Sequence, residues 1–310
     1  ENNTTVACNT AVGHVAMQQN TTGANNSALG FCALRDNTTG ASNTAIGRQS
    51  LQVNTTASSN TAVGNNSMNC NTTGHSNTAV GRYALYENTT ANNNTAVGFC
   101  ALMDNTTGAN NVAIGVEAFE NNTVVMGVEA LTTATTGHTN TAIGRQAMCK
   151  TTTGATNVAV GAFALCANTT AANNVAVGTC ALKVSTTGTA NAIGDISLDA
   201  NTTGSNNTAV GRSSMSNNTT GGTNAAFGGN ALNANTTGNQ NTAAGYQALA
   251  SNTTAGDNTA VGYNSLVLNT TGACNSALGT GSLTANTTGA ENTAVGSAAM
   301  LVSTTGCKNT

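Results

Sequence analysis

The amino-acid sequence predicts an all-β fold, a flattened parallel β-solenoid (a β-roll) that is built from a 17-residue repeat, with about 18 coils and two short strands in each coil. Three observations support this prediction: a glycine recurs at a nearly constant spacing, an apolar alternation precedes it, and a second apolar position follows it. A fixed period of this length is typical of a repeat array. The marker glycine stands at positions 13, 30, 47, 64, 81, 98, 115, 127, 144, 161, 178, 194, 211, 228, 245, 262, 279 and 296.

The three residues before the marker glycine predict the first strand of each coil. Thr-Ala-Ile at 44–46 and Val-Ala-Val at 158–160 show the pattern. Side chains alternate between the two faces of a strand, so the first and third residues share a face. Because Thr and Val have similar shapes and the third residue is always apolar, we expect this shared face to point into the core.

The second apolar position lies four residues after the marker glycine and predicts the opposite wall of the coil. Leu34 and Met68 are examples, and Ala or Ser always precedes this position. We expect a second short strand here. A helical repeat is disfavoured, because a coil of this length is too short for two helices with turns and because Asn, Thr and Gly are poor helix formers.

The repeat predicts a single continuous solenoid over residues 1–310, with no polar cap at either end. Two coils depart from the period: a shortened coil at 116–127 and a 16-residue coil at 179–194. The shortened coil lacks the usual Asn-Thr-Thr-Gly turn, so we expect a local irregularity around Asn121–Val125. The marker glycine is never replaced, which predicts a positive φ or a close backbone approach.

Composition and charge argue against several function classes. Only 6% of the residues are charged, and the formal net charge is −3. No basic patch points to nucleic acid, and no apolar run is long enough to predict a membrane span. The three histidines, His14, His75 and His138, form no spacing typical of a metal site or a nucleophile–base pair. We therefore expect no catalytic site, no metal site and no cofactor, and we do not expect an enzyme.

The strand-and-glycine motif resembles a known family. Asn-Val-Ala-Ile-Gly at 111–115 and Asn-Val-Ala-Val-Gly at 157–161 and 174–178 resemble the head repeats of trimeric autotransporter adhesins. The longer phrase Asn-Thr-Ala-Ala-Gly-Tyr-Gln-Ala-Leu at 241–249 resembles repeats of fibre proteins that end in a chaperone-of-endosialidase domain. The resemblance implies a left-handed β-roll in an adhesin-like fibre on a cell surface.

Most coils also contain an Asn-Thr-Thr triplet, which is an N-glycosylation acceptor. Ala, Ser or Thr replaces this asparagine in some coils while Thr-Thr stays, so we expect the asparagine to be exposed and some triplets to bear glycans. The alternative is an ice-binding protein that uses the stacked threonines. The candidate acceptors are Asn3, Asn20, Asn37, Asn54, Asn71, Asn88, Asn105, Asn168, Asn201, Asn218, Asn235, Asn252, Asn269 and Asn286.

The two positions after the marker glycine vary most and contain most of the aromatic and arginine residues. Variable side chains on a regular scaffold suit packing against a neighbouring subunit or a ligand, although the pattern favours a tolerant solvent-facing edge. We name this set the contact stripe: Phe31, Arg48, Arg82, Tyr83, Phe99, Arg145, Phe163, Arg212, Tyr246 and Tyr263.

Cys149 and Cys166 occupy the same repeat position in neighbouring coils. Their Cα atoms should lie about 4.8 Å apart, which is within the range that a disulfide tolerates. The sequence leaves open whether the pair is a disulfide or two thiols.

Together these features predict an extracellular structural rod or filament subunit of a surface fibre. The expected partners are further copies of the chain, arranged end to end or side by side.

Overall fold

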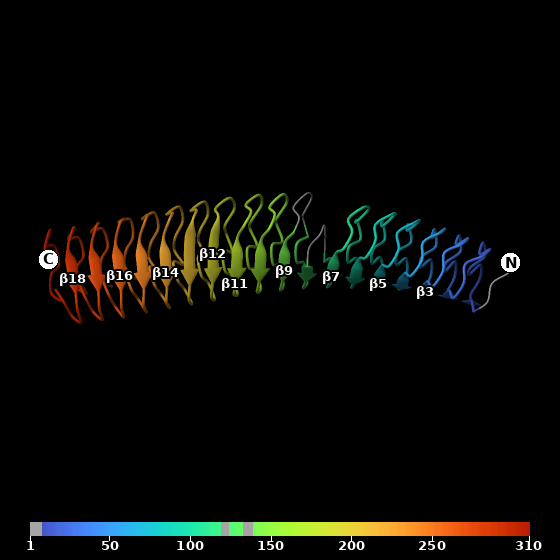
Figure 1. Ribbon diagram of the computed structural model, residues 1–310, viewed down its shortest axis with the longest axis horizontal. Helices are drawn as coiled ribbons and strands as arrows, with labels where there is room; N and C mark the ends of the chain where they lie inside the picture. Colours follow the sequence, from blue (N-terminus) through green and yellow to red (C-terminus); the bar gives the residue numbers. More distant parts are fainter. Residues whose placement is uncertain (1–7, 119–123, 133–138) are drawn as a thin grey trace. The chain divides into compact units, whose positions relative to one another are not determined.

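The computed structural model describes residues 8–118, 124–132 and 139–310, and they group into two compact units, residues 1–146 and 147–310. Figure 1 shows short strand arrows that recur along the chain in both units. The described residues of the first unit contain nine strands: β1 (Thr10–Val12), β2 (Ser27–Leu29), β3 (Thr44–Ile46), β4 (Thr61–Val63), β5 (Thr78–Val80), β6 (Thr95–Val97), β7 (Val112–Ile114), β8 (Val124–Met126) and β9 (Thr141–Ile143). The second unit contains β10 (Val158–Val160), β11 (Val175–Val177), β12 (Ala190–Ile193), β13 (Asn207–Val210), β14 (Ala225–Phe227), β15 (Thr242–Ala244), β16 (Thr259–Val261), β17 (Ser276–Leu278) and β18 (Thr293–Val295).

Within each unit every strand pairs in parallel with the next strand along the chain. Between β3 and β4, Thr44 pairs with Thr61, Ala45 with Ala62 and Ile46 with Val63. Each column of the repeat is therefore a physical column of side chains, and the predicted all-β parallel solenoid is confirmed. In the two irregular coils, Val112 pairs with Val124 and Val175 with Asn191. The irregularity expected at 121–125 falls partly outside the described residues, while Val124 and Val125 lie in β8.

The prediction of two strands per coil is wrong, because the described part of each coil contains one. The opposite wall is a run of turns in which the second and fourth residues after the marker glycine have positive φ, such as Gln49 at 58° and Leu51 at 48°. Left-handed residues cannot continue a strand. The wall is still bonded along the stack: the Gln49 amide donates to Phe31 O at 2.8 Å, and the Leu51 amide donates to Ser67 O at 3.0 Å.

The predicted orientation of the strands is also wrong. The central alanine points inward: Ala45, Ala62 and Ala79 are fully buried, whereas Ile46 is 39% exposed and Val80 is 37% exposed. The physical reason is the thinness of the coil. The opposite wall already places a fully buried Leu or Met, such as Leu51, in the interior. The narrow space between this side chain and the strand holds the methyl group of alanine in every strand but β8, where Val125 is buried, so the larger Thr and Val side chains of the other strands turn outward.

The marker glycine meets both conditions expected of it. Gly47 has a φ of 133°, and a Cβ added there would lie 2.4 Å from the carbonyl oxygen of Gly64 in the next coil. Any side chain would therefore be strained and would also push the coils apart. Within the part of the chain that the structure describes, no helical segment has the length and apolarity needed to cross a bilayer.

Candidate functional site

The outward side of the strands forms two columns of exposed side chains, which we call the strand face. It consists of the two residues that flank the inward central residue of each strand, which in the four-residue strands β12 and β13 are Asn191 and Ile193, and Thr208 and Val210. The first column is mainly Thr or Val, and the second is mainly aliphatic. No residue of the strand face in β1 to β18 is charged. The second column includes Leu29, Ile46 and Val80, whose side chains are more than a third exposed. The strand face is therefore a regular, uncharged and partly apolar surface.

The asparagines of the Asn-Thr-Thr triplets do not lie on the surface, so the expectation that they are exposed is wrong. Asn37, Asn54 and Asn71 are fully buried and form a ladder that runs along the stack. The side-chain nitrogen Nδ2 of Asn54 donates to Asn37 Oδ1 at 2.8 Å and to Ala57 O at 3.0 Å. Asn71 in turn donates to Asn54 Oδ1 at 2.9 Å.

This ladder conflicts with N-glycosylation. A glycan would be attached to Nδ2, and the two bonds that Asn54 Nδ2 donates use both of its hydrogens. A sugar there would remove one of them and would need space in the interior of the coil. Asn3 lies outside the described residues. Twelve further acceptor asparagines share the buried position of Asn54: Asn20, Asn37, Asn71, Asn88, Asn105, Asn168, Asn201, Asn218, Asn235, Asn252, Asn269 and Asn286.

The asparagine that precedes each strand forms a second ladder. Asn43 Nδ2 donates to Ala57 O at 2.8 Å, the same carbonyl that accepts from Asn54. Asn43 Oδ1 accepts from the backbone N–H of Asn60 at 3.0 Å. Both asparagines of a coil are therefore structural, and together they fix the turn between them.

The threonine pair of the triplet is also partly used by the scaffold. Thr38 Oγ1 donates to Thr55 O at 3.0 Å in the next coil, and only the following residue, Thr39, is well exposed. The turn therefore offers a single exposed threonine per coil. An ordered threonine array exists instead on the strand face.

In the first unit the contact stripe brings aromatic rings and guanidinium groups together along neighbouring coils. Arg48 lies over the Phe31 ring at 5.8 Å. Arg82 lies 4.7 Å from the Tyr83 ring centroid and 5.8 Å from that of Phe99. His14, which the sequence reading left out of the stripe, stacks on Phe31 with 5.5 Å between centroids. These exposed cation–π contacts stabilise the surface by about 0.5–1 kcal/mol each.

In the second unit the stripe is sparser. Tyr246 and Tyr263 stack at 5.7 Å, and Arg212 pairs with Asp195 at 3.7 Å. Phe163 is half-buried in another coil. Arg145, the last stripe residue of the first unit, is exposed. The stripe thus contains three aromatic clusters, two in the first unit and one in the second, and its described residues enclose no binding site.

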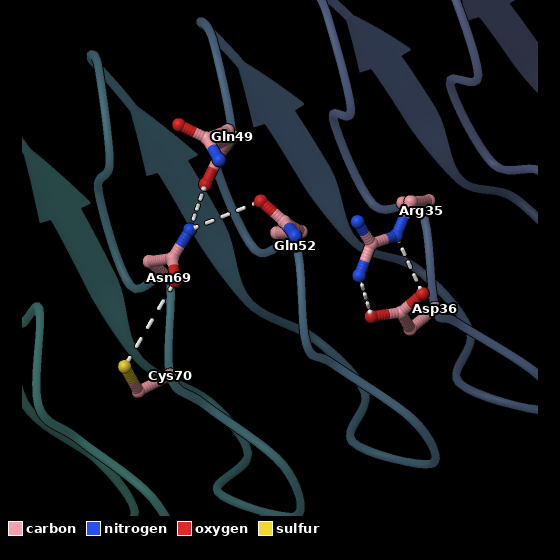
Figure 2. A network of polar contacts seen from close by, with 6 residues as sticks. All are labelled: Arg35, Asp36, Gln49, Gln52, Asn69 and Cys70. Carbon is pink, nitrogen blue, oxygen red and sulfur yellow. Dashed lines mark hydrogen bonds and ion pairs between the residues drawn. The ribbon is translucent and has the colours of Figure 1, made fainter.

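A group of polar contacts lies on the turns of the first unit (Figure 2). Arg35 Nη2 pairs with Asp36 Oδ2 at 2.6 Å, and Asn69 Nδ2 donates to the backbone oxygen of Gln49 at 2.9 Å. The Cys70 thiol donates to Asn69 Oδ1 at 3.9 Å, and burial raises the pKa of this thiol. The Asn69 bonds link two neighbouring coils, whereas the Arg35–Asp36 pair lies within a single coil.

Two shallow hollows occur in the described residues. One of about 250 Å³ is lined by Cys100, Met103, Asp104, Glu117 and Thr132. Burial raises the pKa of the Cys100 thiol, which is the opposite of what a reactive cysteine needs. His14 and His75 are exposed, and His138 lies outside the described residues. Among the described residues no three His, Cys, Asp or Glu side chains gather as a metal site would require.

The two cysteines that share a repeat position do meet. Cys149 Sγ and Cys166 Sγ lie 2.9 Å apart, and both thiols are half-buried. Both cysteines are present as thiols in the structure. Burial, the hydrogen bond to Cys166 and the nearby Cys166 charge raise the pKa of Cys149 to about 12.

Sequence reasoning missed the strand face, although one signal marked it. The inward strand residue is alanine in every strand except β8, while the flanking positions vary among Thr, Val, Ser, Asn, Ala, Ile, Leu, Met and Phe. Constancy of a small residue indicates close packing, and variation indicates a surface. Comparison with known proteins adds no assignment, because no family model and no curated protein matches the chain.

Proposed function

We propose that the chain is a structural subunit of an adhesin-like extracellular fibre, and that copies of it associate side by side through the strand face. The observation that supports this most is the uncharged, partly apolar surface that repeats from coil to coil. A contiguous exposed apolar patch on a soluble protein usually marks an interaction site, and charged side chains would oppose such contact. The strand face contains no charged residue.

The size of the strand face suits a second copy of the chain. Nine strands spaced about 4.8 Å apart, with three residues each, give an outward face of roughly 400 Å² per unit. Exposed apolar patches of several hundred Å² usually mark interaction sites on soluble proteins. Two such faces can pack about 10 Å apart, with the columns of one copy between those of the other. Side-by-side association is therefore favoured over the end-to-end alternative. The location at a cell surface rests on the family resemblance alone.

Lysine substitutions on the strand face test this proposal. The triple variant Leu29→Lys, Ile46→Lys and Val80→Lys places one cation in each of three coils, all at exposed positions. Sedimentation velocity and electron microscopy should show assemblies for the unmodified chain and monomers for this variant. The matched control is Thr39→Lys, Thr56→Lys and Thr73→Lys, at exposed turn positions. Equal association of all three proteins, or a monomeric unmodified chain, would rule out the strand face as the interface.

A second candidate function is ice binding, and the threonine column of the strand face favours it. Thr44, Thr61, Thr78 and Thr95 are half-exposed in successive strands, beside the aliphatic column. This array differs from the turn threonines that the sequence suggested. If the chain binds ice, the unmodified chain should show thermal hysteresis. The strand-face triple variant should lose this hysteresis, and the turn control should keep it. No hysteresis in the unmodified chain would eliminate it.

A further inference from the structure

Cys149 and Cys166 form the only pair of cysteines in adjacent coils at equivalent positions among the nine cysteines of the chain. The backbone holds the two coils in register on both sides of the pair. The Met148 amide donates to Ala164 O at 3.0 Å, and the Lys150 amide donates to Cys166 O at 3.1 Å. With coils about 4.8 Å apart, the Cα separation suits a disulfide.

The sulfur atoms are nearly in bonding position already. Their separation of 2.9 Å must shorten by less than about 1 Å to reach the S–S bond length of about 2.05 Å. The remaining cysteines have no thiol at the equivalent position of either neighbouring coil; for example, Tyr83 and Glu117 flank Cys100.

We propose that Cys149 and Cys166 are a redox modification site that closes into an intercoil disulfide by exchange with a small disulfide of the glutathione type. In the first step the Cys166 thiolate attacks one sulfur of the small disulfide, forms a mixed disulfide and releases one thiolate. In the second step Cys149 loses its proton to solvent and its sulfur attacks Cys166 Sγ, which releases the second thiolate. The two protein thiols lose two electrons in total, and the small disulfide is reduced to two thiols.

The order of the steps follows from the surroundings of the two sulfurs. The raised pKa of Cys149 makes it a poor first nucleophile in neutral solution. Once Cys166 is in a mixed disulfide, Cys149 lies beside the sulfur it must attack. Proximity then compensates for the small thiolate fraction.

The bond would fasten the first two coils of the second unit. These coils follow, along the chain, the irregular stretch that contains the shortened coil. In a repeat array each coil contacts only its neighbours, so a pair of coils can open locally without unfolding the whole array. Closing a loop of about 15 residues should slow this opening by up to about 100-fold on the chain-entropy model.

The test uses the whole chain equilibrated in mixtures of reduced and oxidised glutathione, quenched in acid and digested with trypsin for mass spectrometry. Cleavage after Arg145, Lys150 and Lys183 gives peptides 146–150 and 151–183. The expected product joins these two peptides, and amide exchange in residues 147–178 should slow on oxidation. Cys180 also lies in the second peptide, so Cys180→Ser is the matched control and should still form the bond.

Three outcomes would overturn the proposal. One is glutathione on both Cys149 and Cys166 with no joined peptide, and another is loss of the joined peptide in Cys180→Ser. A chain that stays fully reduced, while a free dithiol peptide in the same tube becomes oxidised, would also overturn it. In Cys149→Ser, the expected product is a stable glutathione adduct on Cys166 and no change of amide exchange on oxidation.

Discussion

Replacing Gly81 by alanine is expected to lower the free energy of unfolding of its part of the solenoid by at least about 3 kcal/mol. Two costs combine. Gly81 has a φ of 142°, which L-residues rarely adopt, and the new Cβ would lie 2.2 Å from Gly98 O. The obstacle is backbone rather than a movable side chain, so the next coil must shift as a whole. Amide exchange resolved by residue, together with urea unfolding, measures the loss.

Gly74 in the same coil provides the matched control. An added Cβ there would also be close to the next coil, 2.4 Å from Ala91 O, but Gly74 does not have a positive φ. The neighbouring coils already contain alanine at this position, Ala57 and Ala91, so the turn can adapt. Gly74→Ala should therefore cost far less than Gly81→Ala. Equal losses would show that backbone conformation does not explain the constancy of the marker glycine.

Replacing Asn54 by leucine is expected to lower the free energy of unfolding by roughly 2–6 kcal/mol, since it leaves two buried polar groups without a partner at about 1–3 kcal/mol each. Asn37 Oδ1 would lose the donor at 2.8 Å, and Asn71 Nδ2 would lose the acceptor at 2.9 Å. Leucine has a similar size, so the effect isolates hydrogen bonding from cavity formation. Urea unfolding followed by circular dichroism, with local amide exchange, provides the measurement.

Two controls accompany this variant. Asn54→Ser should cost less, because serine occurs naturally in this column at Ser185, whose Oγ donates to Gly188 O at 3.3 Å. Thr56→Ala, at an exposed position, should change the stability by under about 0.5 kcal/mol. If Asn54→Leu were as mild as Thr56→Ala, the asparagine ladder would not contribute to stability and the triplet would be free for another role.

Much of the fold could be predicted from the sequence because a repeat converts sequence period directly into coil geometry. The glycine spacing located every strand, and the two irregular coils appear as the pairings of Val112 with Val124 and Val175 with Asn191. The buried Leu and Met wall was also predicted, as Leu34 and Met68 show. These features depend on local pattern alone.

The orientation of the strands could not be predicted from alternation, because alternation identifies two faces without saying which is inside. Hydrophobicity favoured Val inside, but the thickness of the coil decides the matter, and thickness depends on the wall opposite. Leu51 reaches across from that wall and leaves room only for Ala45. The same narrow interior explains why Asn54 is buried: its amide supplies hydrogen bonds to a turn that has no strand partner.

The backbone conformation of the opposite wall could not be predicted from the sequence either. Positive φ at a leucine such as Leu51 is costly, and no sequence rule predicts it. The column of hydrogen bonds to both neighbouring coils offsets this cost only when the coils are already stacked. The local conformation is therefore a consequence of the assembly of coils.

The inward alanine and outward valine are the central claim, because the strand face, the interface and the threonine array all depend on them. The most direct test compares Ala79→Leu with Val80→Ala by urea unfolding of monomeric protein, within one strand. Ala79 is fully buried and Val80 is 37% exposed. We predict a loss of about 1–3 kcal/mol or more for Ala79→Leu, from overpacking, and under about 1 kcal/mol for Val80→Ala. Alanine already occupies the Val80 column at Ala244. A larger loss of unfolding free energy for Val80→Ala than for Ala79→Leu would contradict the account, because it would mean that Val80 points into the core and Ala79 points outward.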